Sequence, residues 1–164
     1  MHQNILVPTD GSAHAALAIE EAFDLASTYD ATVHLLYVMD ETTRGDGLIG
    51  MSGPHPYTKL REIGERAIGK MAMKAEDSGV RVTTEVRPGI PYETIIDYAH
   101  ENDIDVIIMS SHKRSGVRRF IFGSVTERVV RGTEIPVIVV QRKSASEGDG
   151  DTTAETAQES ATTG

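Results

Sequence analysis

The sequence contains no cysteine. Disulfide bonds, thiolate nucleophiles and cysteine-ligated metals are therefore excluded, and cysteine usage says nothing about the redox compartment. Long apolar runs are also missing, because stretches such as 106–109 and 136–140 fall far below the roughly 20 residues that a membrane-spanning helix needs. The start, Met-His-Gln-Asn, lacks the basic flank and apolar stretch of a signal peptide. We therefore expect a cytoplasmic protein with no membrane partner.

Positive charge is scarce, with 16 Lys and Arg against 25 Asp and Glu and a net charge of −9. Nucleic acids are held mainly by Lys and Arg at the phosphates, so this balance argues against a nucleic-acid partner. Residues 144–164 are Ser, Thr, Ala, Gly, one Gln and acidic types with no large apolar residue, a composition that cannot offset the entropy of ordering a chain. We expect one folded domain over 1–143 and a disordered acidic tail over 144–164.

Short runs rich in Val, Ile and Leu alternate with longer segments of helical periodicity. This alternation indicates an α/β fold, an open five-stranded parallel sheet with crossover helices on both faces. The expected strands are 4–7, 32–38, 80–86, 105–109 and 137–140.

Capping and stop signals place the helices between these strands. Ser12 is the expected N-cap of the first helix, Gly79 closes the second, and Pro91 opens the third. The expected inward faces are Ala15, Ala18, Ala22, Leu25 and Ala26 in the first helix, Leu60, Ile63, Ala67, Met71 and Ala75 in the second, Ile95, Ile96 and Ala99 in the third, and Val125, Val129 and Val130 in the fourth.

The segment 40–56 breaks this pattern, since it is rich in glycine and proline and has little apolar periodicity. We expect a long loop there, either a lid or, in the interpretation we favour, a mobile connection.

Ligands of open parallel sheets bind outside the carboxyl ends of the strands, where the winding direction reverses. The first strand runs into Pro8-Thr9-Asp10, and the fourth ends at Met109 and continues into a loop over 110–126. If these two strands are neighbours, their ends face each other across one crevice. That crevice is the candidate site.

The loop over 110–126 has the features of an anion site. Gly123 allows close approach of the backbone to a ligand, and the free N–H groups of the helix that follows favour an anion. Positive charge gathers in this loop within an otherwise acidic protein, at Lys113, Arg114, Arg118 and Arg119. A phosphate group is the ligand that these features favour.

Part of this loop also fits ordinary helix capping. Ser124 and Glu127 have the spacing of a capping box, so capping alone accounts for that pair, and both interpretations stay open. The chain contains neither a Walker A loop nor a Gly-x-Gly-x-x-Gly turn. The histidines show no metal-ligand spacing, so no metal site is assigned, apart from Mg²⁺ carried by a bound nucleotide.

Several separated motifs resemble the universal stress protein family. They are Pro-Thr-Asp after the first strand, Ile108-Met109-Ser110-Ser111-His112 leading to Gly123-Ser124-Val125-Thr126, and Pro136-Val137-Ile138-Val139-Val140. The resemblance covers residues 3 to 142. It implies a Rossmann-like fold of the adenine nucleotide alpha hydrolase type, with strand order 3-2-1-4-5.

In ATP-binding members of that family the loop reads Gly-x-x-Gly, nine residues, then Gly-Ser or Gly-Thr. Here the spacing is kept, but Ser110 and Lys113 replace the first two glycines and only Gly123 remains. The resemblance implies ATP as ligand, alone or with Mg²⁺, with Asp10 at the ribose or adenine end and Val38 at the adenine. The implied binding residues are Pro8, Thr9, Asp10, Val38, Met109, Ser110, Lys113, Arg114, Gly123, Ser124, Val125 and Thr126.

The leading functional hypothesis is a nucleotide-responsive stress-response protein to which no catalytic residue is assigned. A slow ATP hydrolase and a nucleotide-independent interaction module remain alternatives. Residues 136–140 are continuously apolar and are expected at a sheet edge, which invites pairing with another chain. Together with the resemblance, this predicts a homodimer formed through the last strand.

Overall fold

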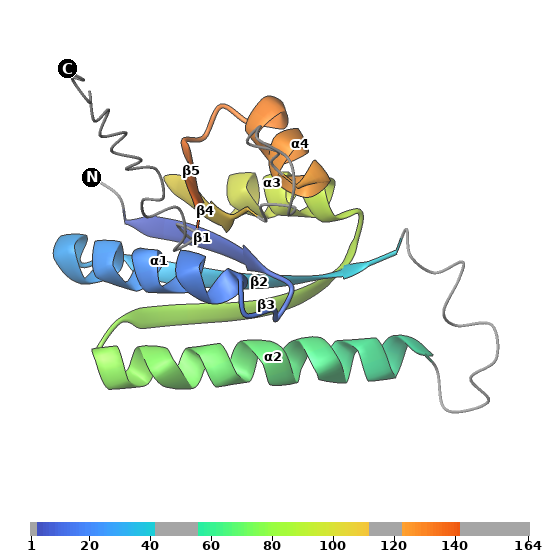
Figure 1. Cartoon of the computed structure of the whole chain (residues 1–164), viewed down its shortest axis with the longest axis horizontal. Coiled ribbons are helices and arrows are strands. Elements are labelled where there is room, and N and C mark those ends of the chain that lie inside the picture. Colours follow the sequence, from blue (N-terminus) through green and yellow to red (C-terminus); the bar gives the residue numbers. More distant parts are fainter. Residues whose placement is uncertain (1–2, 42–55, 112–122, 142–164) are drawn as a thin grey trace, which may run out of the picture.

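The fold was analysed in a computed structural model that describes residues 3–41, 56–111 and 123–141. Strands and helices alternate throughout these ranges (Figure 1). The strands are β1 (Asn4–Thr9), β2 (Thr32–Asp40), β3 (Arg81–Gly89), β4 (Val106–Ser110) and β5 (Val137–Val140), and the helices are α1 (Ala15–Tyr29), α2 (Pro56–Ser78), α3 (Pro91–Glu101) and α4 (Ser124–Gly132). All five predicted strands are present, although β1, β2 and β3 run two or three residues beyond their predicted ends.

The strands form one parallel sheet in the order β3-β2-β1-β4-β5, as predicted. Pro8 of β1 lies opposite Leu36 of β2, while on its other side β1 pairs with β4 through Ile5 and Val106. The winding direction therefore reverses between β1 and β4, and the ends of these two strands are neighbours.

The helices form two layers, with α1 and α2 on one face of the sheet and α3 and α4 on the other (Figure 1). Successive strand residues point to opposite faces, so Leu35 belongs to the core beneath α1 and α2 and Leu36 to the core beneath α3 and α4. Both leucines are fully buried. Each face of the sheet therefore has its own apolar core.

The helix-end signals were correct in two of three cases. Gly79 follows α2 with a φ of +69°, and Pro91 is the first residue of α3. Ser12 is not the N-cap of α1, which begins at Ala15 with His14 as N-cap and no side-chain capping bond. The reason is local, because the backbone N–H of Ser12 donates to the Asp10 carboxylate at 2.9 Å and holds Ser12 in a turn before the helix.

Two residues predicted to face inward are exposed instead. Ile63 of α2 is 45% exposed and Val130 of α4 is 43% exposed. In α2 the buried face passes through Gly64, whose missing side chain lets the helix lie against the Tyr37 ring. Ile63 is turned away from the sheet as a result. The predicted residues that are buried are Ala15, Ala18, Ala22, Ala26, Ala75, Ile95, Ala99 and Val129, and those partly buried are Leu25, Leu60, Ala67, Met71, Ile96 and Val125.

β5 lies at an edge of the sheet, as predicted, and its Ile138 is 39% exposed. The predicted long loop falls almost entirely, and the predicted tail wholly, outside the described residues, so both stay predictions. Among the described residues, no helix combines the length and the apolar character that crossing a membrane requires.

Candidate functional site

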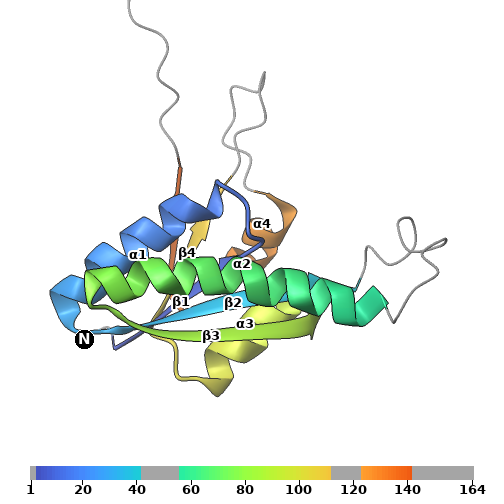
Figure 2. The same cartoon turned by 90° about the horizontal axis from the view of Figure 1, so that it is seen from below.

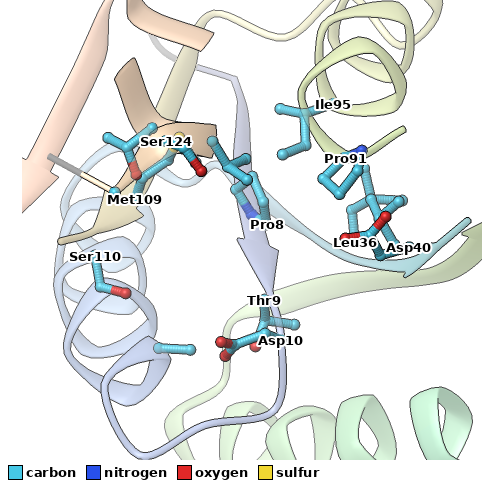
Figure 3. Close-up of a pocket in the computed structure, with 15 residues that line it drawn as sticks. Pro8, Thr9, Asp10, Leu36, Asp40, Pro91, Ile95, Met109, Ser110 and Ser124 are labelled. Carbon is cyan, nitrogen blue, oxygen red and sulfur yellow. The ribbon is translucent and has the colours of Figure 1, made fainter. Parts of the chain in front are cut away.

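A cavity of about 350 Å³ opens at the carboxyl edge of the sheet, where β1 and β4 diverge. Its volume is in the range of small-molecule sites, which is about 300 to 1,000 Å³. The cavity brings together every described residue of the predicted site (Figure 3). These residues are Pro8, Thr9, Asp10, Val38, Met109, Ser110, Gly123, Ser124, Val125 and Thr126. Lys113 and Arg114 lie outside the described residues.

The turn after β1 holds Asp10 at the rim of the cavity. The Thr9 hydroxyl accepts a hydrogen bond from the Gly11 N–H at 3.1 Å, and the Asp10 carboxylate accepts one from the Ser12 N–H at 2.9 Å. Gly11 has a φ of +78°, a backbone conformation that residues other than glycine rarely adopt. The turn therefore fixes an exposed carboxylate beside the β1–β4 crevice.

The start of α4 faces the cavity with its first turn. The first N–H groups of a helix have no intrahelical acceptor and carry partial positive charge. Ser124, Val125 and Thr126 form this first turn, and all three line the cavity. A side chain added at Gly123 would meet no described atom within 4 Å, so the backbone there is open to a ligand. This end of the cavity is suited to an anion.

The capping-box interpretation of Ser124 and Glu127 is wrong. Gly123 occupies the N-cap position and no side chain caps the helix, which places Ser124 one residue inside it. Glu127 instead pairs with Arg131 at 2.9 Å, one turn further along α4. Helix capping thus no longer competes with ligand binding as the role of Ser124.

Five lining residues were absent from the predicted site: Ala15, Leu36, Asp40, Pro91 and Ile95. Leu36 and Asp40 lie two residues to either side of Val38 on β2, so the period of a strand could have identified them. Pro91 and Ile95 reach the cavity because α3 packs over β2, and no sequence pattern specifies that placement.

The two sides of the cavity differ in chemistry. In Figure 3, Leu36, Pro91 and Ile95 lie on one side, whereas Met109, Ser110 and Ser124 lie on the other. The first side offers apolar surface for a flat ring, with the Asp40 carboxylate nearby. The second offers two serine side chains, Met109 and the α4 N–H groups. A ligand with an apolar ring at one end and an anionic group at the other matches this division.

A buried polar pair holds α3 to the sheet behind the cavity. The Tyr98 hydroxyl of α3 lies 3.0 Å from His34 Nδ1 of β2, and both side chains are buried. Burial lowers the pKa of His34, which favours the neutral imidazole. The pKa of Tyr98 is raised, mainly by burial. Because Ile95 lies one turn before Tyr98, this pair also fixes the wall of the cavity.

Arg87 of β3 covers the outer side of this pair. Its guanidinium lies 4.7 Å from the centre of the Tyr98 ring and pairs with Glu101 at 2.7 Å and Glu85 at 2.5 Å.

Across 3–41, 56–111 and 123–141, no three His, Asp or Glu side chains gather as they would around a metal ion.

The chain was compared with known proteins. A family model described as "Universal stress protein family" matches residues 1–141. Universal stress protein MJ0531 of Methanocaldococcus jannaschii is 31% identical over 146 residues, which cover 87% of this chain and 84% of that protein.

Two solved structures are also similar. MJ0577 of the same organism has a TM-score of 0.71 and 31% identity, and the match covers 87% of this chain and 98% of that one. The universal stress protein from Archaeoglobus fulgidus in complex with dAMP has a TM-score of 0.61, with 84% of this chain and 97% of that one covered. At 19% identity, the second likeness shows the fold alone.

Proposed function

Because this chain belongs to the universal stress protein family, we propose that it binds an adenine nucleotide, ATP, in the cavity at the carboxyl edge of its sheet. One observation carries the proposal: the cavity is lined by all ten described residues that the family motifs assign to the nucleotide. Its apolar side fits a purine ring, and its α4 side fits phosphates.

In the proposed complex the residues divide between the two ends of the nucleotide. Val38, Leu36 and Ile95 pack against the adenine, and Asp10 accepts a hydrogen bond from the ribose or the adenine. The first turn of α4 donates its N–H groups to the phosphates, and Ser110 and Lys113 lie in the same loop region of the sequence. Mg²⁺, when present, is held by the phosphates rather than by a protein cluster.

The proposed role is regulatory and cytoplasmic. ATP would shift the conformation or the dimerisation of the chain, and so change which partners it contacts. The dimer would form through β5 (Val137–Val140) and the preceding Pro136, because an edge strand presents unpaired backbone N–H and C=O groups to a second copy.

Two other functions are weighed against this one. A slow ATP hydrolase requires a group that positions water at the γ-phosphate, and Asp10 and Glu127 are the described candidates. A nucleotide-independent interaction module is favoured by the replacement of two loop glycines by Ser110 and Lys113. Product release in a turnover assay distinguishes the hydrolase, and ATP affinity distinguishes the module.

The test is titration calorimetry of ATP and AMP against three forms of the chain: unmodified, Lys113→Gly and Lys143→Gly. Lys143→Gly removes the same charge at a position that the family motifs do not assign to the nucleotide, and it is the matched control. We expect ATP to bind at least about tenfold more tightly than AMP, a difference of about 1.4 kcal/mol, because the added phosphates reach the α4 first turn. Absence of ATP affinity in all three forms would overturn the proposal. Tight binding only after Lys113→Gly would show that Lys113 disables the loop.

The proposed dimer has a separate test. Ile138→Lys places a charge on the exposed side of the edge strand, and the matched control Val130→Lys places the same charge on α4. We expect sedimentation to give a dimer for the unmodified chain and the control, and a monomer for Ile138→Lys. A monomeric unmodified chain at micromolar concentration would contradict the dimer.

A further inference from the structure

A second cavity, of about 740 Å³, forms a groove lined by residues of α1 and α2. These two helices cover the face of the sheet opposite to α3 and α4 (Figure 2). Its floor is apolar and includes Ile19 and Phe23 of α1 and Met71 of α2. Gly11 lines one end, where a side chain would come within 3.1 Å of Ala67. Gly11 follows β1 by two residues, so this end of the groove is level with the carboxyl edge of the sheet.

The α2 wall of the groove carries a line of cations. Arg66, Lys70 and Lys74 all line the groove and are exposed, whereas α1 contributes one acidic residue, Glu20. None of the three cations forms an ion pair with another described residue. They follow one another at intervals of four residues, which places successive charges about 6 Å apart along a helix. In a chain with a net charge of −9, this wall is a local surplus of positive charge.

The sequence after β5 contains a complementary pattern. Residues 147–151 read Glu-Gly-Asp-Gly-Asp, with acidic residues at every second position. In an extended chain, alternate side chains lie on one side and are about 6.6 Å apart. Glu147, Asp149 and Asp151 therefore match the spacing of the three cations, and the glycines between them add no side chain that would hold the backbone off the groove.

The connection is long enough for this match to occur within one molecule. β5 ends at Val140, which leaves six residues before Glu147. Six extended residues span about 20 Å. β1 lies two strands from β5, a distance of about 10 Å. Since the carboxyl edge carries both Val140 and the Gly11 end of the groove, the segment reaches the groove from that end.

We propose that residues 147–151 of the tail dock in extended form along the α1–α2 groove, with Glu147 beside Arg66, Asp149 beside Lys70 and Asp151 beside Lys74. The docked segment enters next to Asp10, at the rim of the nucleotide cavity. The proposal rests on the opposite charges of the two segments, the similar intervals between those charges and the length of the connection after β5. It does not depend on nucleotide binding.

Paramagnetic relaxation enhancement in the full-length chain tests the proposal. Ala154→Cys provides a single labelling site, because the chain has no other cysteine. We expect a nitroxide at this position to broaden the amide signals of Ile19, Ala67 and Met71 more than those of Ile95 and Val129 in the other layer. Salt at 1 M, where the Debye length is about 3 Å, should remove most of this difference.

The charges are tested by variants on both partners. Glu147→Gln with Asp149→Asn and Asp151→Asn should abolish the selective broadening without changing any residue of the folded domain. Glu155→Gln with Glu159→Gln is the matched control and should retain it. Arg66→Glu with Lys70→Glu and Lys74→Glu should also abolish it, and adding Glu147→Lys, Asp149→Lys and Asp151→Lys to that variant should restore it.

Three results would overturn the proposal. One is equal broadening of the two layers in the unmodified chain. Another is selective broadening that survives removal of the three tail charges. The third comes from mixing isotope-labelled chains with separate spin-labelled chains: groove broadening in that mixture would assign the occupant to a neighbouring copy rather than to the same chain.

Discussion

The α1–α2 layer packs small side chains closely against the sheet, whereas the α3–α4 layer uses larger side chains and leaves a cavity at the carboxyl edge. Ala18 and Ala22 of α1 are fully buried, and Ala15 is the α1 residue that reaches the cavity at the carboxyl edge. In the other layer, Ile95 and Tyr98 are buried beneath α3. The sheet therefore borders a cavity on its α3–α4 face, whereas the groove of the other layer is lined by residues of α1 and α2 and of the turn after β1.

The two layers also differ in buried polar groups. The His34–Tyr98 pair lies in the α3–α4 layer, close to the wall of the cavity. Buried polar groups specify one arrangement more sharply than apolar contacts, because only the right geometry satisfies them. This pair fixes the position of α3, and with it Pro91 and Ile95. The α3 residues that line the cavity keep their position through this polar contact, whereas the alanines of α1 hold that helix against the sheet by close packing alone.

The largest expected effect comes from a pair of adjacent core residues. Leu35 and Leu36 are equally buried but belong to opposite layers. Leu35→Ala should lower the free energy of unfolding by about 3 to 5 kcal/mol, since it leaves a void in a closed core. Leu36→Ala should cost about 2 to 3 kcal/mol, because Leu36 already borders the cavity and has fewer contacts to lose. Urea unfolding with unchanged m-values measures the free energy of unfolding of both variants. Equal decreases would contradict the claim that the core beneath α1 and α2 is packed more closely than the core beside the cavity.

The next effect concerns the α3–α4 layer alone. Ser124→Asp places a carboxylate in the α4 first turn, where the proposed phosphates bind, and should weaken ATP affinity about tenfold or more by charge repulsion. Val130→Asp adds the same charge to the same helix at a position that is 43% exposed, and affinity should stay within about twofold. Calorimetry compares the two. Equal weakening would mean that the total charge of the chain, rather than the cavity, governs binding.

A third prediction concerns how the stability of the fold depends on pH through the buried His34–Tyr98 pair of the α3–α4 layer. Because burial lowers the pKa of His34 in the folded state, the neutral form is favoured there and the unfolded chain binds a proton more readily. Stability should therefore be fully present above the unfolded pKa of about 6.5 and should fall as the pH drops below it. Urea unfolding from pH 8 to pH 5 measures this slope.

The control for this slope is another histidine of the same layer. His34→Gln should flatten the slope between pH 7 and pH 5, whereas His100→Gln, at an exposed position on α3, should leave it unchanged. A slope that persists in His34→Gln would assign the acid sensitivity to groups other than the buried pair.

The strands and helices could be predicted from local signals, because β-branched runs mark the strands. The strand order and the ten predicted residues that line the cavity came instead from the resemblance to the family, whose motifs lie where β1 and β4 end. The apolar wall could not be predicted in the same way. Pro91 and Ile95 reach the cavity through the packing of α3 over β2, a contact between distant segments that leaves no periodic trace in either.

The errors within helices have a related cause. Periodicity assigned Ile63 and Val130 to inward faces because apolar residues recur there, but the rotation of each helix is set by its closest contact with its neighbours. In α2 that contact is Gly64 against the Tyr37 ring. A pattern of apolar side chains cannot predict this contact, because glycine has no side chain. The expected N-cap, Ser124, was wrong by one residue, because Gly123 occupies that position. Glycine and serine are both common N-cap residues, so the sequence alone does not choose between neighbours of these two types.

The smallest expected effect compares two arginines, one from each side of the sheet. Arg61 of α2 pairs with Glu65 at 2.9 Å, with both side chains more than half exposed, so water screens the pair. Arg61→Gln should lower the free energy of unfolding by about 0.3 kcal/mol. The Arg87 side chain is 26% exposed, pairs with two carboxylates and lies over the buried Tyr98 ring, so Arg87→Gln should cost about 1 kcal/mol. Thermal and urea unfolding resolve this difference, and equal costs would show that the Tyr98 cluster adds nothing beyond ordinary surface pairing.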